Sequence, residues 1–119
     1  MPVDAVIDRY CEAWSTADPE RRAALLNSVW ADGGLYTDPT VHAAGAAALL
    51  DHITAVLARR PGSRVERTGP IQPHHDVACF DWQAVGADGA VLRRGIDIVI
   101  FDASGRLARV IGFFAPTPA

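Results

Sequence analysis

The segment from Arg94 to Phe114 constrains the fold more than any other part of this 119-residue sequence. It contains two apolar runs whose side chains alternate with a period of two residues, which is typical of β-strands with apolar groups on both faces. Asp102-Ala103-Ser104-Gly105 lies between the runs as a turn, where Gly105 can take a positive φ without steric cost. The segment therefore predicts an antiparallel hairpin within a β-sheet.

One acidic residue is unexpected in this hairpin. Asp97 stands between two isoleucines in the first of the two strands. Burying an ionised carboxylate without a partner is costly, so Asp97 must be paired, hydrated in a cavity or protonated. An ion pair with Arg93, Arg94 or Arg109 is one solution, and a place facing a pocket is the other.

Composition excludes several classes of protein. Half of the residues are hydrophobic, which indicates a folded domain. The formal net charge of -3 and the lack of a basic run longer than two arginines argue against a nucleic-acid partner. No apolar stretch is long enough to span a membrane, and the N-terminus lacks the pattern of a signal peptide. The two cysteines fit free thiols, so we expect a cytoplasmic protein that binds neither nucleic acid nor membranes.

Sequence periodicity and turn residues predict three helices followed by an antiparallel sheet. The helices are expected at residues 3–16, 19–29 and 46–58, a short strand at 35–37, and further strands at 63–69, 71–75 and 77–85 before the hairpin. Asp32-Gly33-Gly34 is expected to end the second helix. This order is typical of an α+β fold in which helices cover one face of a curved sheet and enclose a pocket.

The order of elements and several motifs resemble the NTF2-like superfamily, also described as SnoaL-like. The motifs are YCEAW followed closely by STADPE, then LYTDP, a glycine before the third helix, and GIDIVIFDASGRLARVIGFF. The resemblance covers essentially the whole chain. It implies one cone-shaped domain over residues 1–119, with three N-terminal helices packed on the curved sheet.

Within this superfamily, the functional pattern is similar to that of the bacterial ketosteroid isomerases. Those enzymes have a tyrosine in the first helix, an aspartate before a proline, and an aspartate in the next-to-last strand, which here are Tyr10, Asp38 and Asp97. The resemblance implies that Asp38 moves a proton next to a ketone, while Tyr10 and protonated Asp97 donate hydrogen bonds to the enolate oxygen. Such a proton transfer requires no metal or cofactor.

The resemblance also implies a hydrophobic ligand, steroid- or polyketide-like, and a homodimer. Apolar residues on the outer face of the sheet, which one layer of helices cannot cover, favour the dimer as well. The aromatic residues expected to bind substrate are Trp14, Trp30, Phe80, Trp82 and Phe113. They could equally be ordinary core residues.

Each catalytic candidate also has a purely structural explanation. Tyr10 could be a core residue whose hydroxyl reaches a backbone carbonyl. Asp38 followed by proline is a favoured signature of a type I turn. Ile53 stands where the isomerases often place a second tyrosine, so the hydrogen-bond network behind Tyr10 should be thinner here.

Other activities can be compared with the same positions. Limonene-type epoxide hydrolases have an arginine and a second aspartate where this chain has Gly95 and Gly112, which argues against epoxide hydrolysis. The SnoaL polyketide cyclases use a strand aspartate as base, a role that Asp97 alone would satisfy. A non-catalytic ligand-binding or dimerisation module is a further alternative, because a fold alone does not define function. His74 and His75 should point to opposite faces of a strand, which predicts no shared metal site.

Overall fold

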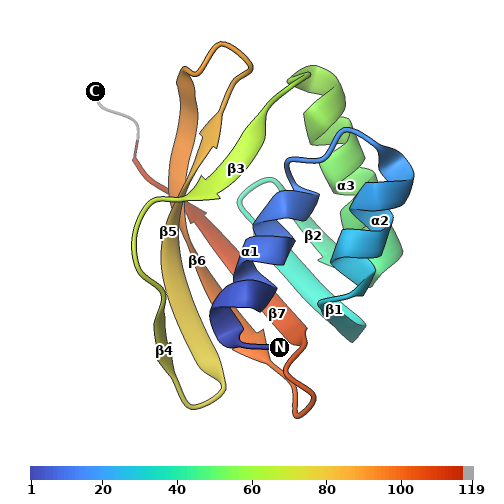
Figure 1. The fold of residues 1–119 in the computed structure, drawn as a ribbon, viewed down its shortest axis with the longest axis vertical. Coiled ribbons are helices and arrows are strands. Elements are labelled where there is room, and N and C mark those ends of the chain that lie inside the picture. Colours follow the sequence, from blue (N-terminus) through green and yellow to red (C-terminus); the bar gives the residue numbers. More distant parts are fainter. Residues whose placement is uncertain (117–119) are drawn as a thin grey trace.

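The predicted hairpin forms the middle of a seven-stranded sheet (Figure 1). The computed structural model describes residues 1–116; residues 117–119 of the predicted domain lie outside the described part. The strands are β1 (Trp30–Asp38), β2 (Val41–Ala44), β3 (Arg64–Arg67), β4 (Gln72–His74), β5 (Val77–Val85), β6 (Val91–Phe101) and β7 (Leu107–Phe114). Their order is β2-β1-β7-β6-β5-β3, with β4 also paired to β5, and only β1 and β7 run parallel.

Three helices lie on one side of this curved, unclosed sheet (Figure 1). They are α1 (Val3–Ala13), α2 (Pro19–Asn27) and α3 (Ala46–Arg59). The predicted α+β fold class is confirmed. Within residues 1–116, no helix is long and apolar enough to cross a membrane.

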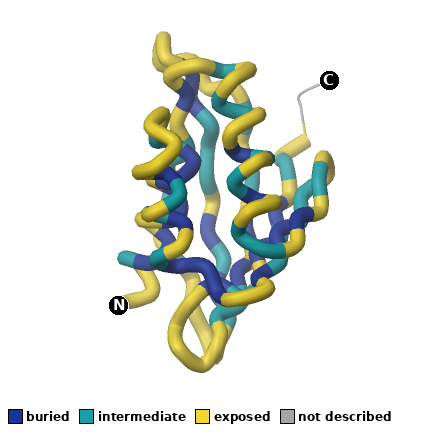
Figure 2. The backbone as a smooth tube through the Cα atoms, turned by 90° about the vertical axis from the view of Figure 1, so that its right-hand side faces the viewer, coloured by how far each residue is buried: buried dark blue, intermediate teal, exposed yellow. Residues whose placement is uncertain are grey.

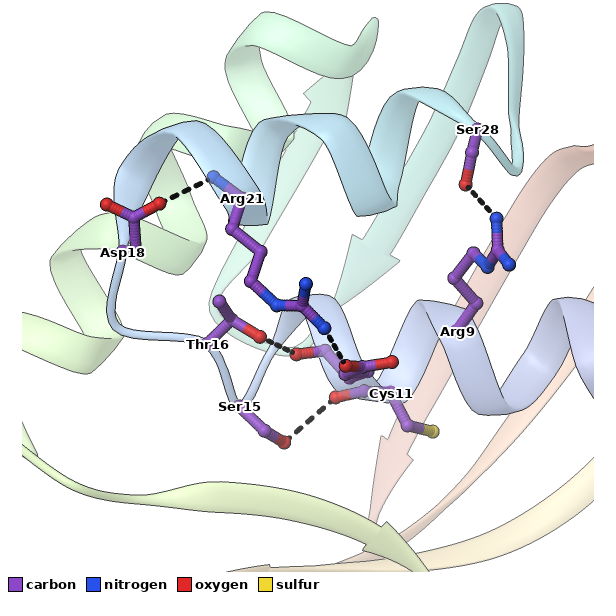
Figure 3. A network of polar contacts seen from close by, with 8 residues as sticks. Arg9, Cys11, Ser15, Thr16, Asp18, Arg21 and Ser28 are labelled. Carbon is purple, nitrogen blue, oxygen red and sulfur yellow. Dashed lines mark hydrogen bonds and ion pairs between the residues drawn. The ribbon is translucent and has the colours of Figure 1, made fainter.

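Helix α1 ends earlier than predicted because two hydroxyls take over its last carbonyl groups. Ser15 Oγ donates to Cys11 O at 2.9 Å, and Thr16 Oγ1 donates to Glu12 O at 2.7 Å (Figure 3). Side chains that satisfy the last turn in this way compete with further helical hydrogen bonds. Ser15 Oγ also accepts from Val65 N at 2.9 Å, which joins the end of α1 to β3.

The main difference from the sequence prediction is at β1. Asp32-Gly33-Gly34 was expected to end α2, but the strand already begins at Trp30, and β2 was not predicted. Gly33 takes a φ of 69°, and the pairing with β7 changes register between Trp30 and Leu35. Trp30 Nε1 donates to Gly34 O at 3.2 Å, and a Cβ on Gly34 would lie 2.6 Å from that nitrogen. The glycines thus form an irregularity within a strand rather than a helix end.

The core lies between the helices and the sheet, while exposed residues lie on the outer faces of the helices and in the loops at the two ends of the molecule (Figure 2). In β6, Asp97 and Val99 face this core and are buried. Ile96 and Ile98 face the opposite way and are each 37% exposed. The alternation of the strand therefore puts the carboxyl of Asp97 on the helical side of the sheet.

Candidate active site

A largely apolar pocket of about 160 Å³ lies between the helices and the sheet. Its walls come from α1, α3 and five strands, and the three predicted catalytic residues all line it. Tyr10 comes from α1, Asp38 from the end of β1 and Asp97 from the middle of β6. The fold therefore brings together three side chains that are far apart in the sequence.

Asp97 is buried, with 6% of its surface exposed. Trp82 Nε1 donates to its Oδ1 at 2.9 Å, and no arginine among the described residues forms an ion pair with it. Burial raises the pKa of Asp97 to about 7; the Trp82 hydrogen bond opposes this shift, and the charge of Asp38 adds to it. Of the two explanations for this residue, the structure favours the pocket-facing one.

Gly95 and Gly112 leave the space that the carboxyl of Asp97 and its indole partner occupy. A Cβ on Gly95 would collide with the indole of Trp82. Trp82 and Gly95 are cross-strand partners, and the indole covers Gly95 while its N–H donates to Asp97. A Cβ on Gly112 would lie 3.1 Å from Asp97 Oδ1 and 3.3 Å from Asp38 Cβ. The same two glycines that argue against epoxide hydrolysis therefore allow the indole contact and the close approach of the two aspartates.

Asp38 both forms a turn and faces the pocket. Its Oδ1 accepts from Thr40 N at 2.7 Å, Thr40 Oγ1 at 2.6 Å and Val41 N at 3.2 Å, as expected of an Asp-Pro turn. Its Oδ2 accepts from the hydroxyl of Tyr36 at 2.6 Å and lies 3.9 Å from His52 Nε2. A substrate proton must therefore compete with several donors for the lone pairs of this carboxylate.

Tyr36 is a site residue that the sequence prediction missed, whereas His52 was expected at most at the rim of the pocket, where it could contact a polar ligand group. Burial raises the pKa of Tyr36 well above its ordinary value, and its hydrogen bond to Asp38 raises it further. Burial lowers the pKa of His52, with Arg59 acting in the same direction and Asp38 opposing, so the imidazole is neutral at neutral pH. The spacing of two residues between Tyr36 and Asp38 could have revealed that both lie on one face of a strand.

The hydroxyl of Tyr10 is a buried donor without a hydrogen-bond partner among residues 1–116. Its ring stacks on Trp30 at a centroid distance of 6.0 Å. Burial raises its pKa, and Tyr36 and Asp97 add to the effect. The indole N–H of Trp14 partly opposes it, but an indole can only donate toward the hydroxyl oxygen, so the hydroxyl proton still has no acceptor among the described residues. The hydroxyl does not reach a backbone carbonyl. Leaving such a group unpaired costs about 1–3 kcal/mol, so the Tyr10 hydroxyl is available to donate to a ligand atom in the pocket.

The predicted aromatic lining differs from the structure in part. Trp14 and Trp82 line the pocket as expected. Trp30 and Phe80 are not among its described lining residues, because both pack into the core, with 3% and 2% of their surface exposed. Trp30 contributes indirectly through its stacking on Tyr10.

Phe113 is also outside the pocket, 51% exposed on the outer face of the sheet. Its neighbour Phe114 lines the pocket instead. The alternation along β7 explains the difference, because adjacent residues point to opposite faces of a strand.

The two adjacent histidines do not point to opposite faces as predicted. His74 Nδ1 and His75 Nδ1 lie 3.2 Å apart. His75 follows β4 in a turn with a φ of 52°, which breaks the strand alternation on which the prediction rested. Among residues 1–116, no group of three or more His, Cys, Asp or Glu side chains could hold a metal ion.

Fold and pocket together define an NTF2-like protein. The sequence profile of the SnoaL-like domain matches residues 7–110, so the chain belongs to the SnoaL-like family. No curated protein matches the chain.

Solved structures support the same assignment. A candidate isomerase of the SnoaL-like family from Agrobacterium tumefaciens is 29% identical with a TM-score of 0.88, covering 94% of this chain and 96% of its own. An NTF2-like protein of unknown function from Exiguobacterium is 20% identical with a TM-score of 0.75, and the match covers 94% of this chain and 99% of the other. A candidate polyketide cyclase from Sinorhizobium meliloti is 18% identical with a TM-score of 0.72, covering 94% of each chain. The last two show the fold alone.

The raised pKa of Asp97 predicts how stability depends on pH. The folded protein keeps this proton up to about pH 7, whereas the unfolded chain releases it near pH 3.8. Between these values the folded state binds more protons, so the free energy of unfolding falls as pH rises, by at most roughly 4 kcal/mol. Asp97→Asn should abolish this fall, because its amide cannot ionise but its oxygen can still accept from Trp82.

Denaturant unfolding of both proteins from pH 4 to pH 8 measures the effect. The variant should gain stability relative to the wild type with rising pH and exceed it at pH 8. An identical pH dependence in the two proteins would contradict the buried, protonated carboxyl.

Proposed function

We propose that this protein is a small-molecule enzyme that shifts a double bond next to a ketone through an enolate. The observation that carries the proposal is the pairing of two donors in one apolar pocket, the partnerless hydroxyl of Tyr10 and the carboxyl of Asp97. Preorganised donors of this kind stabilise a developing oxyanion, by about 3 kcal/mol for a single donor. The similarity to a candidate SnoaL-like isomerase at 29% identity adds support.

The proton would travel by way of Asp38. This carboxylate removes the proton from the carbon between the carbonyl and the double bond, and the electron pair moves onto the carbonyl oxygen. Tyr10 and protonated Asp97 donate hydrogen bonds to that oxygen. Asp38 then returns the same proton to the far carbon of the former double bond, so atoms and electrons balance without a co-reactant.

His52 is a second candidate for carrying the proton. Its lowered pKa keeps the imidazole neutral and able to accept a proton, and its Nε2 lies 3.9 Å from Asp38 Oδ2. Because both oxygens of Asp38 already accept hydrogen bonds, a proton could pass to the imidazole instead.

Pocket size limits the substrate. A protein cavity of about 150 Å³ encloses a molecule the size of benzene. At about 160 Å³, this pocket holds one ring in its enclosed part, and a steroid- or polyketide-like ligand would extend beyond it. A monocyclic ketone is therefore the appropriate first probe.

Turnover of cyclohex-3-en-1-one to its conjugated isomer, followed by ultraviolet absorbance, tests the proposal. Asp38→Asn should lower kcat at least about 100-fold, the usual contribution of a general base. Tyr10→Phe should lower kcat with a smaller change in KM, because its hydrogen bond strengthens on the enolate. Asp51→Asn, at an exposed position of α3 away from the pocket, is the matched control. No turnover by the wild type would refute the isomerase. An unchanged rate in Asp38→Asn would refute Asp38 as the base and leave His52 as the remaining candidate.

The pH profile separates this mechanism from the cyclase-like alternative. As a donor, Asp97 must be protonated, so kcat should fall as pH rises through about 7. As the base of a cyclase-like reaction, Asp97 must be ionised, and the rate should rise through the same range. The rate of the Asp97→Asn variant should show neither change.

A non-catalytic ligand-binding module is the alternative from another class. The pocket and its apolar lining support it as well as they support an enzyme. Native mass spectrometry with hydrophobic ligands decides between them. Binding that persists in Asp38→Asn and Asp97→Asn, without turnover by the wild type, would favour the module.

We also propose that two copies pair through the outer face of the sheet. Ile96 and Phe113 are cross-strand partners there, 37% and 51% exposed, and Ile98 lies beside them at 37%. Apolar residues gathered on an open sheet face are typical of interfaces. Light scattering at micromolar concentration should give twice the chain mass, and Phe113→Asp should lower it; a monomeric wild type would contradict the dimer.

A further inference from the structure

Three arginines line the pocket without an ion pair among the described residues. They are Arg59, Arg60 and Arg93. Three other arginines form ion pairs among the described residues, Arg21, Arg64 and Arg67, so lacking one is not peculiar to the pocket; what sets these three apart is that they share one pocket. Three like charges around one pocket repel one another, and an anion bound among them would relieve this repulsion.

Two elements hold these guanidinium groups at the pocket. Arg59 follows His52 by seven residues, so it lies on the face of α3 that lines the pocket, and Arg60 is the C-cap residue that comes directly after the helix. Arg93 comes from the opposite side, on β6, where its guanidinium carbon lies 4.2 Å from the ring centroid of Phe114. This cation–π contact fixes the Arg93 head on the pocket wall.

The positive charge reaches the interior of the pocket. Arg59 contributes to the lowered pKa of His52, which lies about two turns earlier on the same face of the helix. Compensation of the helix dipole would explain a single arginine at the end of α3. It does not explain Arg93, which belongs to a strand and faces the same space.

We propose that the substrate is an acidic ring compound whose oxyanion, a carboxylate or a phosphate ester, binds the three arginines. Its apolar ring fills the enclosed part of the pocket, and its carbonyl group lies toward Tyr10 and Asp97. This orientation of the carbonyl rests on the proposed function, whereas binding of the oxyanion does not. Arginine suits the task because its planar fork of N–H donors matches both carboxylate and phosphate geometry.

Binding of paired probes tests the inference without turnover. Phenylacetate and phenylacetamide share a ring and differ in charge, and their affinities can be compared by ligand-observed NMR titration. The wild type should bind phenylacetate at least about tenfold more tightly, because charge-assisted hydrogen bonds are about twice as strong as neutral ones. Added sodium chloride should reduce this preference.

Variants of neighbouring arginines provide the matched control. Arg93→Gln should abolish most of the preference for phenylacetate and leave phenylacetamide binding unchanged, and Arg60→Gln should add to the loss. Arg94→Gln changes the same charge one residue away, at an exposed position that does not line the pocket, and should retain the preference. Phenyl phosphate distinguishes the two oxyanions, since whichever of the two acids binds more tightly identifies the group.

Equal affinity of the wild type for acid and amide would overturn the inference, as would absence of phenylacetate binding at millimolar concentration. An equal effect of Arg93→Gln and Arg94→Gln would overturn it too. Charge preference without ketone turnover would refute only the proposed function. Turnover without charge preference would refute only the acidic substrate.

Discussion

The hydrogen bond from Trp82 to Asp97 is the interaction on which the rest of the site depends. It gives a buried carboxyl group one neutral donor and no cation, so burial decides the protonation of Asp97. The contact exists because Gly95 leaves room for the indole, and Gly112 leaves room for the carboxyl beside Asp38. Asp97 is therefore an expected feature of a pocket rather than an anomaly within a strand.

The two aspartates illustrate how environment separates the roles of identical side chains. Asp38 is surrounded by donors from its own turn and from Tyr36, whereas Asp97 has a single indole donor. Their proximity makes simultaneous ionisation unfavourable, which helps to keep the proton on Asp97. Pairs of carboxyl groups whose environments differ in this way can supply an acid and a base at the same pH. The arginines contribute a third, positive region to the same pocket.

Sequence periodicity predicted the parts of this structure that local rules control. The hairpin, the helical stripe that buries Tyr10, and the turn at Asp38 all follow from spacing and turn chemistry. The bounds of β1 did not, because adjacent glycines terminate a helix in most contexts. Here Gly33 takes a positive φ within the strand, and Gly34 leaves room for the indole of Trp30. The place of His52 beside Asp38 could not be predicted, because only tertiary packing brings that face of α3 to Asp38.

The protonation state of Asp97 is the most direct test of this account. Carbon-13 NMR of protein labelled at the aspartate side-chain carboxyls measures the titration of each group. One signal should titrate with a midpoint near pH 7 and be absent from the Asp97→Asn variant. If every aspartate titrates near its ordinary value and the variant removes one of those ordinary signals, the carboxyl of Asp97 is ionised at neutral pH and cannot donate a hydrogen bond to a substrate.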